Sequence, residues 1–208
     1  MALSKIQPAS IDLTANYAFT GTNSITSASS GTYEEKKLAT QTASSSDTLQ
    51  FTSGIDNTYN IYKFRFIDIH PANSGIEFDF QGSTDNTNFN IQMTTTNFQA
   101  NHTEDGSSTA LGYASGRDQA NGTSFNALTH DVVNDADNCV VGELFLFDPS
   151  STTFVKHFIA RTTYMIGAQT QQCFTSGYFN TTSAITGIRF QMETGNIDSG
   201  TIEMYGIN

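Results

Sequence analysis

Residues 62–93 read YKFRFIDIHPANSGIEFDFQGSTDNTNFNIQM, and this stretch decides the fold class. Apolar residues occupy almost every second position, with charged or amide side chains between them. Such alternation is typical of a β-strand with one buried face. The stretch predicts three strands joined by HPANSG and GSTDNTN. Because these connections are short, and parallel pairing needs a crossover of about a dozen residues, we expect antiparallel neighbours.

Each of the three predicted strands has one apolar face. The alternation of the first strand slips at Phe66 and Ile67, which indicates a β-bulge or a buried strand end. In the second strand, Glu77 and Asp79 lie opposite the apolar side chains, and the third strand alternates up to Met93. The stretch as a whole is predicted to be an antiparallel meander with one apolar face.

Similar short runs, bounded by Gly, Asn, Asp, Ser or Pro, recur from residue 38 to the C-terminus. VVGELFLFD, residues 140–148, is apolar on both faces, as expected of a central strand between two layers. No segment of the sequence shows a convincing helical period. Because a second sheet must cover the apolar face of each strand, we predict an all-β fold, namely an antiparallel, jelly-roll-like β-sandwich.

The N-terminal segment, residues 1–36, differs from the rest of the chain. It is rich in Ser, Thr, Ala and Gly and holds too few large apolar residues to fold alone. A flexible tail is one interpretation, and an arm that becomes ordered against a partner subunit is the other. We favour an extended arm for attachment or oligomerisation, followed by a β-sandwich domain at 37–208. The side chains offered to a partner are Ile11, Leu13, Tyr17 and Phe19.

The composition argues against several classes of partner. The chain has 208 residues, with 9 Lys and Arg against 20 Asp and Glu, so its net charge is 9 − 20 = −11. We expect no nucleic-acid partner, because binding to phosphates relies on clustered cations. The N-terminus does not resemble a signal peptide, and no apolar run approaches the roughly 20 residues of a membrane helix. We therefore expect neither membrane insertion nor an export signal of its own.

No combination of residues in the sequence predicts catalysis. Asp68 and His70 share one side of a strand at a spacing that could ligate a metal, but the turn at Pro71 favours an ordinary structural role. Glu77 and Asp79 share a strand face, and nothing in the pattern marks them as buried or perturbed. We expect no catalytic residue, no metal site and no cofactor.

Other chemistry-bearing residues also favour structural interpretations. DVVNDADN, residues 131–138, is acidic but lacks the frame of a calcium-binding loop. Cys139 and Cys173 lie in apolar, strand-like contexts without a C-x-x-C motif. We favour buried free thiols over a disulfide, because unpaired cysteine behaves as a small apolar residue.

The alternation breaks over residues 99–130. A loop of this length is usually functional, disordered or packed on a neighbour. Tyr113 and Phe125 could stack on sugar rings, as aromatic side chains do in many carbohydrate sites, although pinning the loop to the sandwich is the favoured role. The candidate receptor-contact residues are Tyr113, Arg117, Asp118 and Phe125.

Several phrases of the β-domain carry a resemblance to a known family. They are LATQTASSSDTLQFTSGID, YKFRFIDIHP, FDFQGSTD, VGELFLFDPSSTTFVKHF, GYFNTTSAITGIRFQM and GTIEMYGIN. With these phrases the chain resembles a family of virion structural proteins from marine tailed phages, often found at the C-terminal end of fibre-like proteins. MALSKI and IDLTANYAFTGT resemble the leader of such fibres. The resemblance covers residues 37–208 well and the arm in fragments.

The resemblance implies a non-enzymatic virion component, assembled in the host cytoplasm. It also implies a homo-oligomer, with a trimer favoured, that binds other tail or head proteins. Because residues 1–36 are too short for the shaft of a long fibre, we expect a short tail fibre or appendage that contacts host-surface glycans. The alternatives are a capsid decoration protein, bound to the major capsid protein of the head lattice, and a carbohydrate-binding module.

Overall fold

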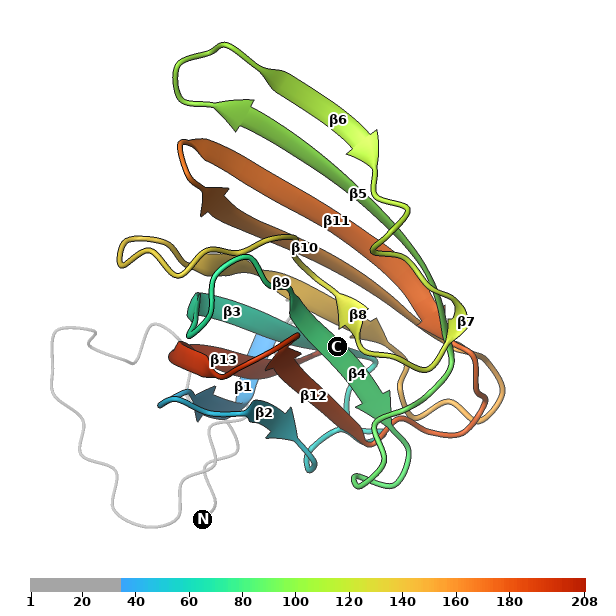
Figure 1. Ribbon diagram of the computed structural model, residues 1–208. Helices are drawn as coiled ribbons and strands as arrows, with labels where there is room; N and C mark the ends of the chain where they lie inside the picture. The colour runs from blue at the N-terminus through green and yellow to red at the C-terminus, as the bar shows by residue number, and fades with distance from the viewer. Residues whose placement is uncertain (1–34) are drawn as a thin grey trace, which may run out of the picture. The chain divides into compact units, whose positions relative to one another are not determined.

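A computed structural model describes residues 35–208, and these residues form strands and turns without a helix (Figure 1). Accordingly, this part of the chain contains no helix able to cross a membrane. The predicted arm residues Ile11, Leu13, Tyr17 and Phe19 lie outside the described residues. The strands are β1 (Glu35–Thr42), β2 (Thr48–Phe51), β3 (Ile61–Pro71), β4 (Phe78–Ser83), β5 (Met93–Thr103), β6 (Thr109–Tyr113), β7 (Ala120–Gly122), β8 (Asn126–Ala127), β9 (Val140–Phe147), β10 (Lys156–Ile166), β11 (Gln169–Phe179), β12 (Gly187–Met192) and β13 (Ile197–Ile207).

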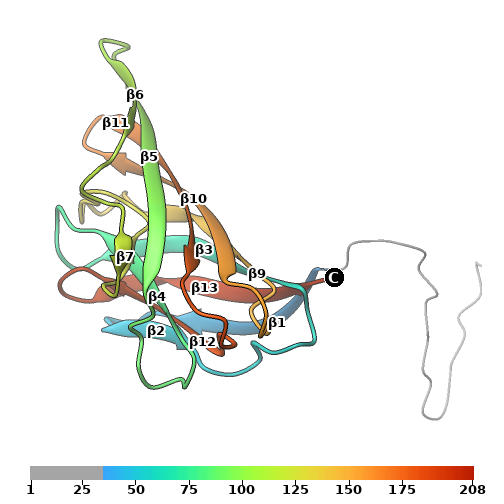
Figure 2. The same cartoon turned by 90° about the vertical axis from the view of Figure 1, so that its right-hand side faces the viewer.

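The strands form two antiparallel sheets of unequal size. The larger is nine-stranded, in the order β1-β13-β3-β9-β10-β11-β5-β6, with β7 also paired to β5. The smaller is four-stranded, in the order β2-β12-β4-β8. The smaller sheet covers one face of the larger, and the β5–β6 hairpin rises beyond it (Figures 1 and 2). The prediction of an all-β, antiparallel sandwich is confirmed.

The predicted meander over residues 62–93 is wrong. Its strands β3, β4 and β5 do not pair with one another, because β3 and β5 belong to the larger sheet and β4 to the smaller. The expected third strand also starts late, since the ladder of β5 begins only at Met93. A short polar connection can bridge two layers about 10 Å apart as readily as it closes a hairpin, so connection length did not identify the pairing.

The predicted irregularity in the first of these strands is confirmed as a break in register. The pairing of β3 with β9 shifts between Phe66 and Ile69, and Asp68 adopts a positive φ of 52°. On the neighbouring strand β13, Gly200 has a φ of 115°. A Cβ at Gly200 would lie 2.5 Å from the Asp68 carbonyl oxygen, so only glycine fits beside the bulge.

A cluster of phenylalanine rings fills the space between the sheets. Phe190 of β12 lies at its centre and is fully buried. Its ring centroid lies between 5.3 and 6.5 Å from those of five neighbours, in edge-on, tilted and stacked geometries. These neighbours come from both sheets and are Phe51, Phe64, Phe66, Phe78 and Phe80.

Two strands depart from their predicted exposure. Every residue of β4 is buried, including Asp79 and Gln81, which the alternation placed on an open face. Strand β9 is central, as predicted, but only one of its faces is fully covered. Leu144 is buried, whereas Phe145 on the other face is only half-buried. An apolar residue on a strand therefore did not always indicate a covered face.

Candidate functional site

The segment predicted to be a long loop, residues 99–130, is largely ordered into strands. It holds the end of β5, the hairpin strand β6, and the short strands β7 and β8. All five residues of β6 are exposed. A strand with solvent on both faces has no reason to alternate, which is why the period-2 pattern missed it.

Tyr113, at the end of β6, is the most accessible of the predicted receptor-contact residues. Its side chain is 57% exposed, and its hydroxyl donates a hydrogen bond to Asp118 Oδ2 over 2.6 Å. This bond raises the pKa of the Tyr113 phenol. The hydroxyl is thereby oriented toward the loop, and the ring remains available for contact.

Arg117, Asp118 and Phe125 lie together, as the sequence interpretation required. They line a pocket of about 330 Å³ that also includes Glu77, whereas Tyr113 does not line it. Arg117 forms ion pairs with Glu77 and with Asp131, the latter over 3.4 Å. Both Arg117 and Phe125 are half-buried, so they hold the loop against the sandwich more than they present a surface.

The pKa of Asp79, on β4, is perturbed, contrary to the sequence expectation. Asp79 is 94% buried, and its Oδ1 has no hydrogen-bond partner among the described residues. Burial raises the pKa of Asp79 to about 8, with further contributions from the charges of Glu77 and Glu193. Burial also raises the pKa of Glu77, although Arg117 opposes this shift. Asp79 is therefore mostly protonated at neutral pH.

The two acids are not arranged as a pair that flanks a substrate. Glycoside hydrolysis uses two carboxyl groups that face each other across a cleft. Glu77 lines the 330 Å³ pocket but is held by Arg117, and Asp79 does not line that pocket. The raised pKa of Asp79 follows from its burial on the face of β4 opposite the core rings of Phe78 and Phe80.

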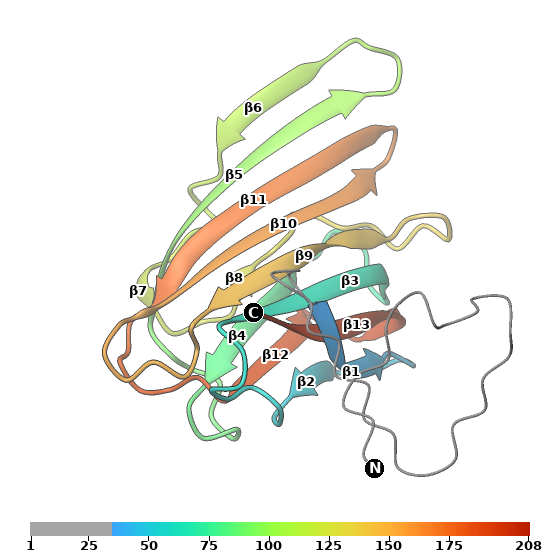
Figure 3. The same cartoon turned by 180° about the vertical axis from the view of Figure 1, so that it is seen from behind.

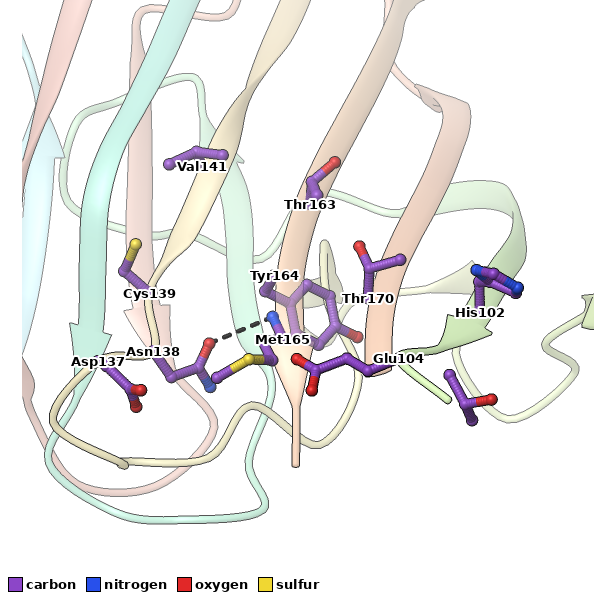
Figure 4. Close-up of a pocket in the computed structure, with 11 residues that line it drawn as sticks. His102, Glu104, Asp137, Asn138, Cys139, Val141, Thr163, Tyr164, Met165 and Thr170 are labelled. Atoms are coloured by element: carbon purple, nitrogen blue, oxygen red, sulfur yellow. Dashed lines mark hydrogen bonds between the residues drawn. The ribbon is translucent and has the colours of Figure 1, made fainter. Parts of the chain in front are cut away.

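A second pocket, of about 500 Å³, lies where β5 and β10 end and β9 and β11 begin (Figure 4). Its lining includes Glu104, Asn138 and Cys139, and Asn138 Oδ1 accepts a hydrogen bond from the Met165 amide over 3.2 Å. Burial and the nearby Asp68 carboxylate raise the pKa of the Cys139 thiol. A protonated thiol is a poor nucleophile and a poor metal ligand.

The remaining candidate ligands do not converge. Cys139 and Cys173 are both free, and Cys173 is buried as predicted, whereas Cys139 is only half-buried. His70 Nδ1 lies 3.6 Å from Asp198, while the Asp68 carboxylate lies beside Cys139. Within residues 35–208, no group of three or more His, Cys, Asp or Glu side chains is placed to hold a metal ion.

The third candidate surface is the outer face of the larger sheet, which is turned away from the smaller sheet and is seen in Figure 3. One row of side chains crosses this face, each residue being the register partner of the next. It begins with aromatic residues and continues with alternating charges. In order, the row is Tyr113, Phe98, Phe174, Arg161, Glu143, Arg65 and Glu203.

A groove of about 480 Å³ lies along this row. The rings of Phe98 and Phe174 stack with centroids 4.8 Å apart and planes 12° apart. Ile159 and Phe145, which are register partners in the next row, line the same groove. We call this surface, lined by Phe98, Phe174, Phe145, Ile159, Arg161 and Glu143, the outer-face groove. No sequence motif indicated it, because its residues come from four different strands.

Comparisons of the chain with protein-family models, with curated proteins and with solved structures found no match. The geometry of the described residues is therefore the basis for interpreting these surfaces.

Proposed function

We propose that this chain is a non-enzymatic structural protein of a tailed-phage virion, most specifically a short tail-fibre or appendage protein. One observation carries the proposal: within residues 35–208, the outer face of the nine-stranded sheet bears most of the strongly exposed large apolar side chains, including Phe98 and Ile159. Such a face suits contact with other proteins. The resemblance of residues 37–208 to marine-phage virion proteins supports the same conclusion.

The strand order supports a jelly-roll core within the sandwich. When the insertions β5–β7 and β10–β11 are left aside, β1-β13-β3-β9 faces β2-β12-β4-β8. Strands that are consecutive in the chain then mostly lie in opposite sheets. Jelly rolls are formed in this way from two Greek keys and are common in viral capsid and lectin domains.

The proposal includes partners of three kinds. The chain forms a homo-oligomer, with three copies favoured, and residues 1–36 attach it to other virion proteins. Tyr113, which is exposed at the C-terminal end of β6 and does not line the outer-face groove, is the contact point for a host-surface glycan. The protein is assembled in the host cytoplasm and is found in the virion.

Capsid decoration is the second candidate, because the jelly-roll order suits a protein of the head lattice as well. A carbohydrate-binding module is less well supported. Sugar rings stack on flat, open aromatic faces, whereas Phe98 and Phe174 stack on each other and cover one face of each ring.

Particle analysis tests the proposal. Mass spectrometry of gradient-purified particles should detect the chain, and immunogold electron microscopy should place it on the tail. Regular labelling over the head would favour the decoration protein. Absence from purified particles, together with abundance in the lysate, would contradict a virion role.

A deletion tests the role of the arm. Removal of residues 1–30 should leave a folded, soluble β-sandwich, checked by circular dichroism, that is no longer incorporated into particles. Full-length protein expressed in the same way is the control. Normal incorporation of the truncated protein would show that the arm is not the attachment element.

A further inference from the structure

We infer that the outer-face groove is the surface through which one copy of this chain packs against a neighbouring copy. The inference rests on the homo-oligomer of the proposed function and names the face that builds it.

The exposed apolar side chains of the protein gather on this face. Ile159 is 53% exposed and Phe98 is 41% exposed, although both are large and apolar. Among residues 35–208, every strongly exposed large apolar side chain except Phe154 lies on the outer face. The others on this face are Leu111, Tyr113 and Val141. Soluble proteins rarely leave such a concentration open to water, so it indicates a face that is covered in the assembled state.

The charge of the outer-face groove differs from that of the whole chain. The chain carries −11, whereas the groove holds one cation, Arg161, and one acid, Glu143, a balance of 1 − 1 = 0. Two copies therefore repel each other less through this groove than through the rest of their acidic surfaces.

The charges in the groove can also exchange partners between copies. Arg161 Nη2 lies 3.5 Å from Glu143 Oε1, and the Arg161 side chain is 58% exposed. This long, open contact leaves each group able to accept a partner from outside. In a closed ring, Arg161 of one copy can meet Glu143 of the next, which fixes the register between copies.

This charge pattern favours a second copy over other occupants. A phosphate-bearing ligand would need an excess of cations around the groove, and the groove holds one cation and one acid. The stacked rings of Phe98 and Phe174 suit burial against apolar side chains.

The experiment measures the molar mass of the full chain in solution by multi-angle light scattering. The wild type should have the mass of an oligomer. Ile159→Glu should shift the mass to that of a single chain that keeps the β-sheet circular dichroism spectrum of the wild type, because Ile159 is half-exposed in the single chain. Phe154→Glu is the matched control: Phe154 is 69% exposed in the β9–β10 connection, and its replacement should leave the oligomer intact.

A charge exchange keeps the test decisive if the Ile159 variant folds poorly. Arg161→Glu should weaken association by about tenfold or more, and adding Glu143→Arg should restore it. A wild type that stays a single chain, or an Ile159→Glu oligomer identical to the wild type, would overturn the inference. The particle analysis is a separate measurement, so failure here is distinguishable from failure of the virion role.

Discussion

The two faces of the larger sheet are built from the same strands but have different roles. In β10, Phe158 faces the smaller sheet and is fully buried, while the next residue, Ile159, is half-exposed on the outer face. In β9, Leu144 and Phe145 make the same contrast. Apolar residues on the inner face stabilise the fold, and those on the outer face are available for contact. The comparison teaches that residue type alone does not separate these roles, since both faces are rich in phenylalanine.

Phe190→Ala should give the largest loss of stability. The ring is fully buried among five other phenylalanine rings, so its removal leaves a cavity that the two sheets cannot close. We expect the free energy of unfolding to fall by about 3–5 kcal/mol. Urea denaturation followed by circular dichroism measures it. A loss below about 1 kcal/mol would mean that the inner face is not the stabilising one.

Asp79→Asn tests the buried acid of β4. The folded-state pKa of about 8 lies above the ordinary value of 3.8, so the folded protein binds more protons, and stability falls as pH rises through this window. Between pH 6.5 and 8 the wild type should lose up to about 2 kcal/mol, and the variant much less.

The pH range for this test avoids the titration of the buried His130. Burial lowers the pKa of His130 to about 4, so its contribution changes mainly below its ordinary value of 6.5. Urea midpoints at pH 6.5 and 8 therefore compare the two proteins. Equal losses in the wild type and in Asp79→Asn would show that Asp79 is not the buried proton carrier.

Phe174→Ala makes the matching change on the outer face. The substitution removes the stack between the Phe174 and Phe98 rings but leaves no enclosed cavity. We expect the single chain to lose about 1 kcal/mol, well below the loss for Phe190→Ala. The measurement uses the Ile159→Glu background, so that association does not add to stability. A loss as large as that of Phe190→Ala would erase the distinction between the faces.

Tyr113→Phe should have the smallest effect. The hydroxyl of Tyr113 bonds Asp118 at an exposed site, where a hydrogen bond to water replaces it. We expect the change in unfolding free energy to stay within about 0.5 kcal/mol. Thermal unfolding of the two proteins checks this. A large loss would mean that this bond holds the β5–β6 hairpin in place.

The sequence predicted what depends on local pattern and missed what depends on pairing. Alternation identified the all-β class, and the slip at Phe66 and Ile67 located the irregularity in β3. Which sheet each strand joins is set by packing over long separations, so the meander was wrong. The burial of Asp79 was missed for the same reason. The alternating pattern placed Asp79 on an open face of its strand, but both faces of β4 are covered.

The candidate sites were only partly predictable. The sequence analysis assigned Arg117, Asp118 and Phe125 to one loop region, and these residues line one pocket. The outer-face groove combines residues from β5, β9, β10 and β11. No spacing in the sequence marks it, because their proximity arises only from the strand order.

Hydroxyl-radical footprinting, read at each side chain by mass spectrometry, tests the division between the two faces most directly. In the Ile159→Glu single chain, Phe98 and Phe154 should be labelled strongly and the buried Phe190 hardly at all. In the wild-type assembly, Phe98 should become protected while Phe154 stays labelled. Equal labelling of Phe98 in both proteins would contradict a contact role for the outer face, and strong labelling of Phe190 would contradict the core.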